Sequence, residues 1–404
     1  MISAAPMTAV APRALDLPAL QRWLVDVPHV DDGGPTFLRA LAGRLVSMGL
    51  PLWRVSLALL TMHPEILWRT VQWSDAEGVT VLDREHARLA TEFYRKSPVA
   101  VAREGAAPVR VRLAEGPSSF TICDDLRAQG GTDYYAHGLP FANGQTSYIS
   151  YATRSPEGFS DEDLAFLEAV RPFLARRLEL ESSYYGTRAL LDVYLGKNAA
   201  RRVLAGAFQR GKGELIDAAI WFSDMRDFTA LSDRSAPAQV VETLDAYFDA
   251  VASAVAARGG EVLKFIGDAV LAIFPVGGDP RAACREALAA AEAALAALGK
   301  LNEARAGRGE STLAIGIALH RGPVMYGNIG ARDRLDFTVI SSCVNEASRL
   351  EALCKGLGTP LSLSGSFVEA AEAEDVVDLG EHELKGVKAP VRVFTLARLA
   401  PRRG

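Results

Sequence analysis

The sequence predicts an α/β domain followed by an α+β domain, joined by a helical connection. At roughly 150 residues per domain, 404 residues leave room for two or three domains. A helical run over 160–208 separates a half of short mixed elements from a half in which strands alternate with long helices. The predicted parts are a flexible tail at 1–13, an amino-terminal domain at 14–183, a linker at 184–213 and a carboxy-terminal domain at 214–397.

In the amino-terminal half, apolar spacing predicts helices and strands in the following order. A helix is expected over 35–48, neighbouring strands over 53–62 and 66–73 with a tight turn at His63–Pro64, and a third strand over 146–153. Ser160 and Asp163 form a capping pattern that opens a helix over 160–181. A second helix is expected over 187–208, after Gly186 and before a break at 211–217.

From Ala218 onward, strands alternate with long helices, which is typical of an α+β domain built on a central sheet. The predicted strands are 218–224, a hairpin over 259–275, two strands within 311–330, one over 336–340 and one at the end of 381–396. The predicted helices are 237–257, 280–299 and 344–355.

Composition excludes several classes of protein. The chain carries 44 basic and 49 acidic residues, a net charge of −5, so it has no overall electrostatic footprint for nucleic acid or an anionic membrane surface. Its 4 cysteines show no metal-type spacing, which favours a reducing compartment. No stretch approaches the roughly 20 apolar residues of a membrane span, and the start of the chain lacks the features of a signal peptide. The sequence therefore predicts a cytoplasmic protein.

Two acidic residues lie at positions in the predicted sheet where their side chains could bind a metal ion. Asp224 ends an apolar strand and Asp268 lies in a hairpin turn, and carboxylate oxygens suit hard cations. Taken alone, each is more often a turn or cap residue. Asn345 and Arg349, four residues apart, share a face of the predicted helix over 344–355, and taken alone they are more often a solvated pair.

Four motifs favour a functional role for these residues, because they follow one another along the chain in the order and at the spacing of a known family. They are FSDMRDFTALSD (222–233), KFIGDAVLAIFP (264–275), GNIGARDRLDFTVI (327–340) and VNEASRLE (344–351). Together they resemble the catalytic domain of the class III nucleotidyl cyclases, over about 218–396. The resemblance implies a central, mostly antiparallel sheet flanked by helices, and a homodimer or pseudodimer with active sites at the subunit interface. It also implies two divalent ions, Mg²⁺ or Mn²⁺, that assist cyclisation of a nucleoside triphosphate.

By this resemblance, Asp224 and Asp268 hold both ions, and the backbone carbonyl of Met225 adds a ligand. The segment that follows, with Phe228 and Thr229, turns toward a helix whose backbone amides would cradle the β- and γ-phosphates.

The resemblance also assigns residues to the base, the ribose and the phosphates. Lys264 would donate to adenine N1 and Thr338 would accept from the 6-amino group, a pair that favours ATP over GTP. Asn345 would orient the ribose, Arg349 would donate to charge developing at the α-phosphate, and Lys385 would contact the terminal phosphates.

Two segments depart from the family pattern. Asp227 replaces a glycine common after the arginine of the first motif, so the backbone there is less free. Ser341-Ser342-Cys343 occupies a turn where the family usually has Gly followed by Asp or Asn. Cys343 is a redox-site candidate, but a small turn filler is the favoured interpretation.

The 14–183 segment resembles a GAF-type sensor domain in its order of elements and its ending at 158–175. The 160–208 stretch resembles the signalling helix and transducer that precede many bacterial cyclase domains. The six histidines lack metal-ligand spacing, which argues against haem or zinc. Six residues could line a pocket for an unknown small-molecule or protein input, although such residues are more often core: Trp53, Trp68, Trp73, Tyr134, Tyr135 and His137.

The leading hypothesis is a soluble, sensor-regulated adenylate cyclase that converts ATP to 3′,5′-cyclic AMP and pyrophosphate. A non-catalytic signalling or dimerisation module is the first alternative, and retention of the motif residues opposes it. A guanylate cyclase is the second, and Lys264 opposes it.

Overall fold

The computed structural model describes residues 14–86, 91, 94, 96–104, 107–207, 209–387 and 389–401. The chain divides into two compact units, Met1–Val193 and Tyr194–Gly404. The predicted tail at 1–13 lies outside the described residues. Within the described part of the chain, no helix is long and apolar enough to cross a membrane.

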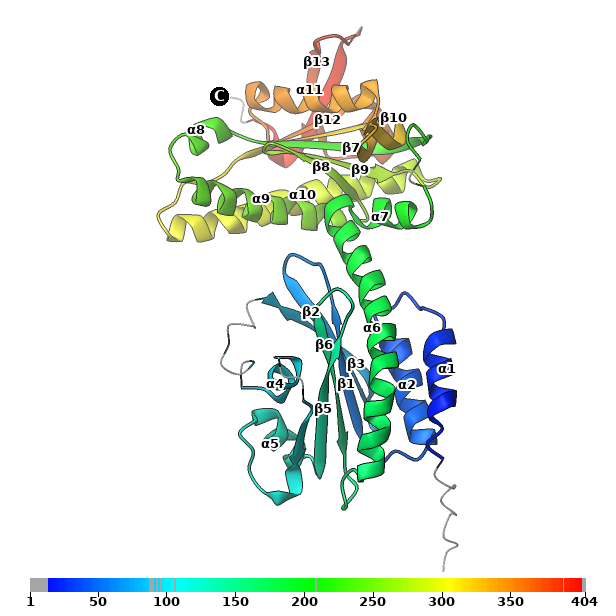
Figure 1. Ribbon diagram of the computed structural model, residues 1–404. Helices are drawn as coiled ribbons and strands as arrows, with labels where there is room; N and C mark the ends of the chain where they lie inside the picture. Colours follow the sequence, from blue (N-terminus) through cyan, green and yellow to red (C-terminus); the bar gives the residue numbers. More distant parts are fainter. Residues whose placement is uncertain are drawn as a thin grey trace, which may run out of the picture. The chain divides into compact units, whose positions relative to one another are not determined.

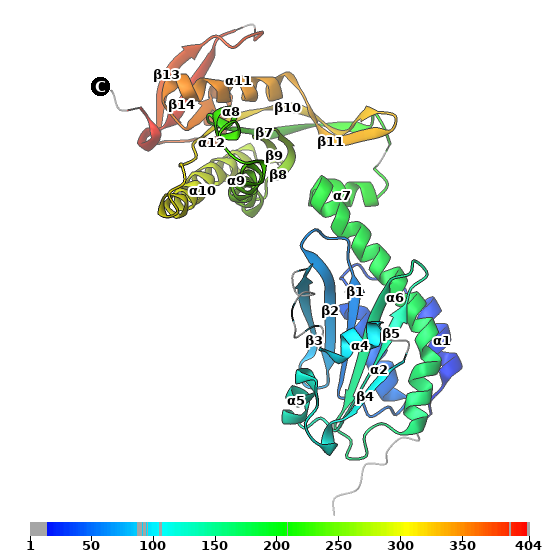
Figure 2. The same cartoon turned by 60° about the vertical axis from the view of Figure 1, so that its left-hand side comes forward.

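In the first unit, the described strands form a six-stranded antiparallel sheet in the order β3-β2-β1-β6-β5-β4 (Figure 1). Helices α1, α2 and α6 cover one face of this sheet, and α4 and α5 cover the other (Figures 1 and 2). The strands are β1 Arg54–Leu60, β2 Ile66–Ser74, β3 Gly78–Glu85, β4 Val109–Arg112, β5 Asp133–Pro140 and β6 Thr146–Thr153. The helices are α1 Leu17–Asp26, α2 Pro35–Ser47, α4 Pro98–Glu104, α5 Thr121–Ala128 and α6 Asp161–Leu195, with a short 3₁₀ turn at Leu113–Glu115.

The two faces of this sheet differ in composition because strand residues alternate. On β1, Val55, Leu57 and Leu59 are fully buried in the main core against the face covered by α1, α2 and α6. The intervening positions, Arg54 and Ser56, point to the face that α4 and α5 cover. The sequence predicted β1, β2, β6 and α2, and the structure confirms them.

Helix α6 is a single helix of 35 residues, so the predicted break at Gly186 is wrong. Its predicted start is confirmed: Asp163 N donates to Ser160 Oγ at 3.2 Å, and Ser160 N donates to Asp163 Oδ2 at 2.8 Å. Gly186 is buried inside the helix, where a Cβ would lie 3.6 Å from Met62. A Cβ at this distance makes an ordinary van der Waals contact, so packing does not explain the glycine, and the helix continues through it. The next helix, α7, covers Lys197–Leu204.

In the second unit, the described strands form an eight-stranded sheet in the order β13-β14-β12-β10-β7-β9-β8, with β11 paired to β10. Every pair is antiparallel except β10 with β12. The strands are β7 Gly213–Met225, β8 Glu261–Ile266, β9 Ala269–Pro275, β10 Ile315–Ala331, β11 Arg334–Ile340, β12 Leu361–Ser364, β13 Val376–His382 and β14 Val391–Leu396.

Helices cover both faces of this sheet (Figure 1). Two long helices, α9 Pro237–Ala257 and α10 Pro280–Gly307, pack with α12 Gly365–Ala371 on one face, and α11 Ser342–Leu357 lies on the other. A five-residue helix, α8 Phe228–Ser232, follows β7, and a 3₁₀ turn covers Ala397–Leu399. The predicted α+β architecture with a central, mostly antiparallel sheet is confirmed for this unit.

The prediction of two strands within 311–330 is wrong, because β10 runs through this region as one strand. Gly322 and Pro323, which suggest a turn, pair in register with Ala218 and Asp217 of β7. Packing requires a glycine at position 322, since a Cβ there would collide with Cys343 Sγ.

Candidate active site

The fold brings the two predicted metal carboxylates together. Asp224 lies at the end of β7 and Asp268 in the turn between β8 and β9. The β7–β9 ladder pairs Ser223 with Val270, which places the residues after Ser223 beside those before Val270. Burial, together with the neighbouring Asp268 carboxyl, raises the pKa of Asp224 to about 6.

This arrangement suits a hard divalent cation. Two neighbouring carboxylates repel when both are ionised, and a cation would relieve that repulsion with the oxygen ligands it prefers. Met225, whose carbonyl is the third predicted ligand, follows Asp224 directly and is buried. Among the described residues no group of three or more His, Cys, Asp or Glu side chains could hold a metal, so a site here would rest on the two carboxylates and backbone oxygen.

An ion pair that the sequence reasoning missed supports this end of β7. Arg226 Nη2 lies 2.7 Å from Glu351 Oε1 on α11, and the Arg226 amide donates to Ala314 O at 2.7 Å. Glu351 is buried, and desolvation raises its pKa to about 7 although Arg226 opposes the shift. Both residues lie within the motifs already singled out, in the MRD and SRLE segments, but nothing in their spacing marks them as partners.

The turn after β7 uses Asp227 in a conformation that favours glycine. Its φ of 57° and ψ of 28° are left-handed, and Asp is one of the few other residues that adopt this region readily. Lys355 Nζ donates to Asp227 Oδ1 at 2.8 Å across an exposed pair. Helix α8 begins at Phe228, which is half-buried, and Thr229 is exposed. The first N–H groups of a helix lack intrahelical partners, so they remain available to an anion.

Lys264 contacts an aspartate that the sequence reasoning did not select. Lys264 Nζ on β8 lies 2.6 Å from Asp336 Oδ2 on β11. Thr338, the predicted partner of Lys264, follows two residues later on the same side of β11 and is 5% exposed. Lys264 therefore contacts the residue that lies two positions before Thr338 on the same face of β11.

The predicted phosphate and ribose residues lie on α11 and in the β13–β14 connection. Asn345 is exposed and Arg349 is half-buried, one turn apart on α11. A Cβ built on Gly386 would lie 3.5 Å from Arg349 Nη1, so the connection that carries the exposed Lys385 reaches this guanidinium. Arg349 and Glu351 are two residues apart and do not share a helix face. Because Glu351 faces Arg226 and Asp224, Arg349 points away from the carboxylates of its own chain.

The departure at 341–343 forms a helix cap. Ser341 is the N-cap of α11, and its hydroxyl oxygen accepts from the Cys343 amide at 3.0 Å. The same hydroxyl donates to Pro323 O at 2.6 Å. This turn therefore has a structural role that needs neither the family glycine nor the Cys343 thiol.

Comparison with known proteins finds similarity over the carboxy-terminal unit. Residues 213–398 match the family model described as the adenylate and guanylate cyclase catalytic domain. Adenylate cyclase 1 of Rhizobium meliloti is 33% identical over 302 residues, 72% of this chain and 44% of the relative. The adenylate cyclase of Anabaena cylindrica is 36% identical over 153 residues, 37% of this chain and 30% of the relative.

A solved structure matches about half of the chain. The adenylyl cyclase CyaB from P. aeruginosa is 26% identical and superposes with a TM-score of 0.43, over 48% of this chain and 98% of that one. The chain spans less than half the length of the two curated relatives.

Proposed function

We propose that the adenylate and guanylate cyclase catalytic domain at residues 213–398 is an active adenylate cyclase that converts ATP to 3′,5′-cyclic AMP and pyrophosphate. The observation that carries this proposal is the pair of neighbouring carboxyl groups, Asp224 at the end of β7 and Asp268 in the β8–β9 turn. The substrate, the metal ions, the dimer and the regulation described below are parts of the same proposal.

Metal binding fits the carboxylate pair. Mg²⁺ or Mn²⁺ ions bound by Asp224, Asp268 and the Met225 carbonyl would neutralise triphosphate charge and lower the pKa of the ribose 3′-hydroxyl. The amides at the start of α8, at Phe228 and Thr229, would bind the β- and γ-phosphates.

The remaining residues position the reacting atoms. The 3′-hydroxyl loses its proton to solvent water, its oxygen forms a bond to the α-phosphorus, the bond to the bridging oxygen of the β-phosphate breaks, and pyrophosphate leaves with that electron pair. Asn345 orients the ribose, and the Arg349 guanidinium donates to the charge that develops on the α-phosphate oxygens. Lys385 contacts the terminal phosphates beside Arg349.

Base selection rests on Lys264 and Thr338, with Asp336 as a positioning residue. Asp336 Oδ2 lies 2.6 Å from Lys264 Nζ, and Thr338, two residues further along β11, is buried. Lys264 would donate to adenine N1, and the Thr338 hydroxyl would accept from the 6-amino group. The Asp336 carboxylate also favours a second candidate function, guanylate cyclase, because a carboxylate accepts from the N1–H of guanine.

We expect Lys264→Glu to lower turnover of ATP by roughly 100-fold, because a carboxylate would face the acceptor at adenine N1 in a partly buried site. The measurement is cyclic product formed by the purified chain from ATP or GTP, with Mg²⁺ or Mn²⁺. Asp336→Asn keeps the shape and removes the charge, so it should weaken ATP use far less than Lys264→Glu does.

The same assay separates the alternatives. Formation of cyclic GMP from GTP, lost in Asp336→Asn, would favour the guanylate cyclase. No cyclic product from either nucleotide would favour a non-catalytic module.

A homodimer is supported by two features of the second unit. Arg349 points away from Asp224 and Asp268 of its own chain, so a site that needs all three draws Arg349 from another copy. Exposed apolar side chains also lie together across β7, β10 and β11, where Leu215 pairs in register with Met325 and Met325 with Ile340. These three are 71%, 44% and 56% exposed, and contiguous exposed apolar groups mark interaction surfaces.

Regulation by the amino-terminal unit is proposed to reach the site through α7. Asn198 on α7 donates to Glu261 Oε2 at 3.3 Å, and Glu261 begins the strand that carries Lys264. Tyr326 Oη on β10 donates to the same carboxylate at 2.8 Å, and the Arg202 guanidinium lies 4.8 Å from the Tyr326 ring. A shift of α7 would therefore alter its contacts with β8 and β10.

We expect a fragment of residues 187–404 to differ from the full chain in cyclase activity by severalfold, because it lacks the unit that biases α7. The measurement is kcat and KM of both proteins under identical conditions. Equal kinetics would leave the first unit without a regulatory role.

A further inference from the structure

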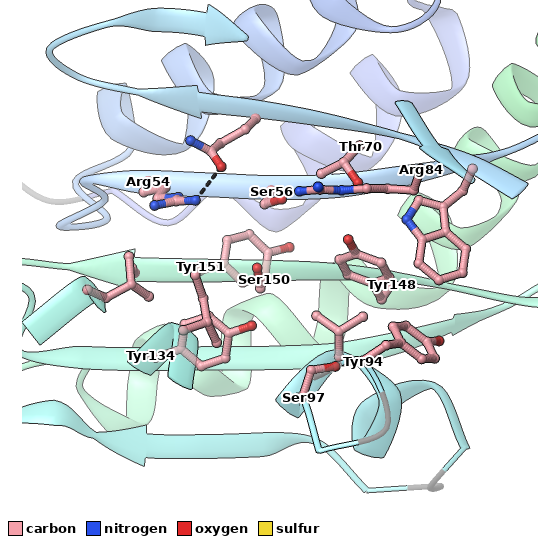
Figure 3. Close-up of a pocket in the computed structure, with 16 residues that line it drawn as sticks. Arg54, Ser56, Thr70, Arg84, Tyr94, Ser97, Tyr134, Tyr148, Ser150 and Tyr151 are labelled. Carbon is pink, nitrogen blue, oxygen red and sulfur yellow. Dashed lines mark hydrogen bonds between the residues drawn. The ribbon is translucent and has the colours of Figure 1, made fainter. Parts of the chain in front are cut away.

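The first unit contains a cavity of about 180 Å³ between its sheet and the α4–α5 side. Strands β1, β2, β3, β5 and β6 line it, together with Val99 of α4 and Ile122 and Leu126 of α5. In Figure 3, Arg54, Ser56, Thr70 and Arg84 lie along one side of the cavity and Tyr94, Tyr134 and Tyr148 along the other. Of the residues predicted to line a pocket, Trp68 and Tyr134 do so, whereas Tyr135 belongs to the main core.

The strand positions that face this cavity are polar where an ordinary core would be apolar. Arg54 and Ser56 of β1 lie opposite Ser74 and Gln72 of β2, and Ser56 lies opposite Ser150 of β6. Burying polar groups is unfavourable unless they gain partners. A polar patch on a helix-covered sheet face, next to a cavity, is therefore more consistent with a binding site than with packing.

One polar group that lines the cavity, the Thr70 hydroxyl, has no hydrogen-bond partner in the described part of the protein. The Thr70 hydroxyl is buried without a hydrogen bond, and Thr70 is 5% exposed and lines the cavity. A buried hydroxyl without a partner costs about 1–3 kcal/mol, which a ligand acceptor or donor would recover.

The lining is cationic. Arg54 and Arg84 line the cavity, and among the described lining residues no Asp or Glu does. Arg54 is held by a hydrogen bond to Gln72, and burial lowers the pKa of its guanidinium while Glu77 and Asp125 act in the other direction. A guanidinium stays charged in proteins and binds carboxylates through paired N–H groups.

The remaining wall is aromatic and the space is small. Trp68, Tyr94, Tyr134 and Tyr148 are each less than 10% exposed and line the cavity. A cavity of roughly 150 Å³ holds one benzene ring, and drug-sized ligands need about 300 Å³ or more. The space therefore fits one six-membered ring with small substituents and is too small for a nucleotide.

We propose that this cavity binds a single-ring aromatic carboxylate, with the carboxylate on Arg54 and Arg84, the ring between the tyrosines and Trp68, and a polar group of the ligand on the Thr70 hydroxyl. The site belongs to the first unit alone and its test is binding, so its outcome is independent of the catalytic proposal.

The experiment is calorimetric titration of the full chain with benzoate, 4-hydroxybenzoate and 4-hydroxycinnamate, and with 4-hydroxybenzamide as the uncharged match. We expect at least one acid to bind with 1:1 stoichiometry per chain and the amide to bind roughly 10- to 100-fold more weakly. Arg54→Gln should weaken the acid by a similar factor. Arg39→Gln, an exposed residue of α2 outside the cavity, should leave the affinity unchanged.

Thr70→Val gives a readout that a purely structural role would not produce. Removing an unpartnered hydroxyl should raise the melting temperature of the ligand-free protein, and the same change should weaken the acid that uses the hydroxyl. Equal affinity for acid and amide, tighter binding of 3′,5′-cyclic AMP than of any acid, or no binding of the three acids at millimolar concentration would each overturn the proposal.

Discussion

Gly316 lies opposite Asp224 in the β7–β10 ladder, and the space beside its Cα is filled by the Arg226–Glu351 ion pair. A Cβ at this position would collide with the Arg226 guanidinium and the Glu351 carboxylate. The geometry at the end of β7 therefore depends on a residue that carries no chemistry of its own.

We expect Gly316→Ala to lower the free energy of unfolding of the second unit by about 1–3 kcal/mol, because the added methyl group overpacks a buried ion pair. Cyclase activity should fall as well, since Arg226 follows Asp224 by two residues. Urea unfolding followed by circular dichroism measures the first effect. The matched control is Gly299→Ala, an exposed position in α10 where a Cβ meets nothing within 4 Å, and helix propensity predicts a gain of up to about 1 kcal/mol there. Equal stabilities of the two variants would contradict the packing argument.

Asp336 marks the limit of what residue types and spacing predict about individual side chains. The apolar pattern placed Asp224 at a strand end and Asp268 in a turn, and the family resemblance added Lys264 on the strand before that turn. They did not identify Asp336 as the partner of Lys264, since that contact depends on how β11 folds back along β10 and approaches β8. The Arg226–Glu351 pair was missed for the same reason: its members are 125 residues apart in the chain.

At the scale of elements, α6 is fixed to the sheet of the first unit by a cluster around His137. His137 of β5 is fully buried, its Nδ1 lies 2.8 Å from Glu168 Oε1 of α6, and Tyr135 Oη donates to the same oxygen at 2.5 Å. Arg171 Nη1 contacts the other oxygen of Glu168 at 3.2 Å, and the Tyr151 ring packs edge-on to His137. Burial lowers the pKa of His137, and the hydrogen bond from His137 helps to lower the pKa of Glu168 to about 2.

Both shifts make the attachment of α6 weaker in acid. The folded chain takes up the His137 proton less readily than the unfolded chain, so this contribution is complete above about pH 6.5 and decreases as the pH falls below that value. The Glu168 contribution is present above pH 4.5 and is lost as the pH falls toward about 2. Between pH 7.5 and 5, therefore, only the His137 contribution to stability changes, and the Glu168 contribution stays constant.

We therefore expect the first unit to lose stability between pH 7.5 and 5, and His137→Gln to reduce that slope by at most about 1.4 kcal/mol per pH unit, the limit for one proton. Tryptophan fluorescence during urea unfolding reports mainly on this unit, because Trp23, Trp53, Trp68 and Trp73 lie in it. His86→Gln changes an exposed histidine and should leave the slope as it is. A variant slope equal to that of the unchanged chain would show that His137 is not the group responsible.

The elements that the sequence predicted best are those with an uninterrupted apolar period. Helix α9 begins and ends at the predicted residues, because a proline opens it and Gly259 follows it closely. The errors lie at glycines and prolines: Gly186 inside α6 and Gly322–Pro323 inside β10 suggest breaks, yet both elements continue. Close packing against Cys343 accounts for Gly322, whereas a Cβ at Gly186 would make only an ordinary contact with Met62. Strands β12 and β13 were missed. Strand β12 has only four residues, and β13, with three apolar residues among its seven, shows no regular alternation of apolar and polar side chains.

At the scale of the whole molecule, the function proposed for the second unit requires two chains. Asp224 and Asp268 lie on the side of the β7 end that Glu351 faces, whereas Arg349 turns toward Gly386. A two-fold homodimer would give two equivalent sites, each with the carboxylates of one protomer and with Lys264, Thr338, Asn345 and Arg349 of the other. The geometry of one chain thus makes a specific prediction about mixtures of inactive variants.

We expect Asp224→Ala and Arg349→Ala to be inactive as homodimers, because both sites of each lack a required group. After mixing and subunit exchange, about half of the dimers would be hybrids, with one site that lacks both groups and one that is intact. The mixture should therefore regain roughly a quarter of the unmutated activity if exchange is random and the sites act independently. The measurement is cyclic product from ATP, with exchange established separately by co-purification of differently tagged chains.

The matched control mixes Asp224→Ala with Asp268→Ala. Both changes belong to the same half of the site, so a hybrid would have one site without Asp224 and the other without Asp268, and no activity should return. Recovery in the first mixture and none in the second would require that the carboxylates and Arg349 of one site come from different chains. If exchange occurs and neither mixture recovers, each site is built within one chain, and Arg349 would have to reach Asp224 through a rearrangement of α11 against β7.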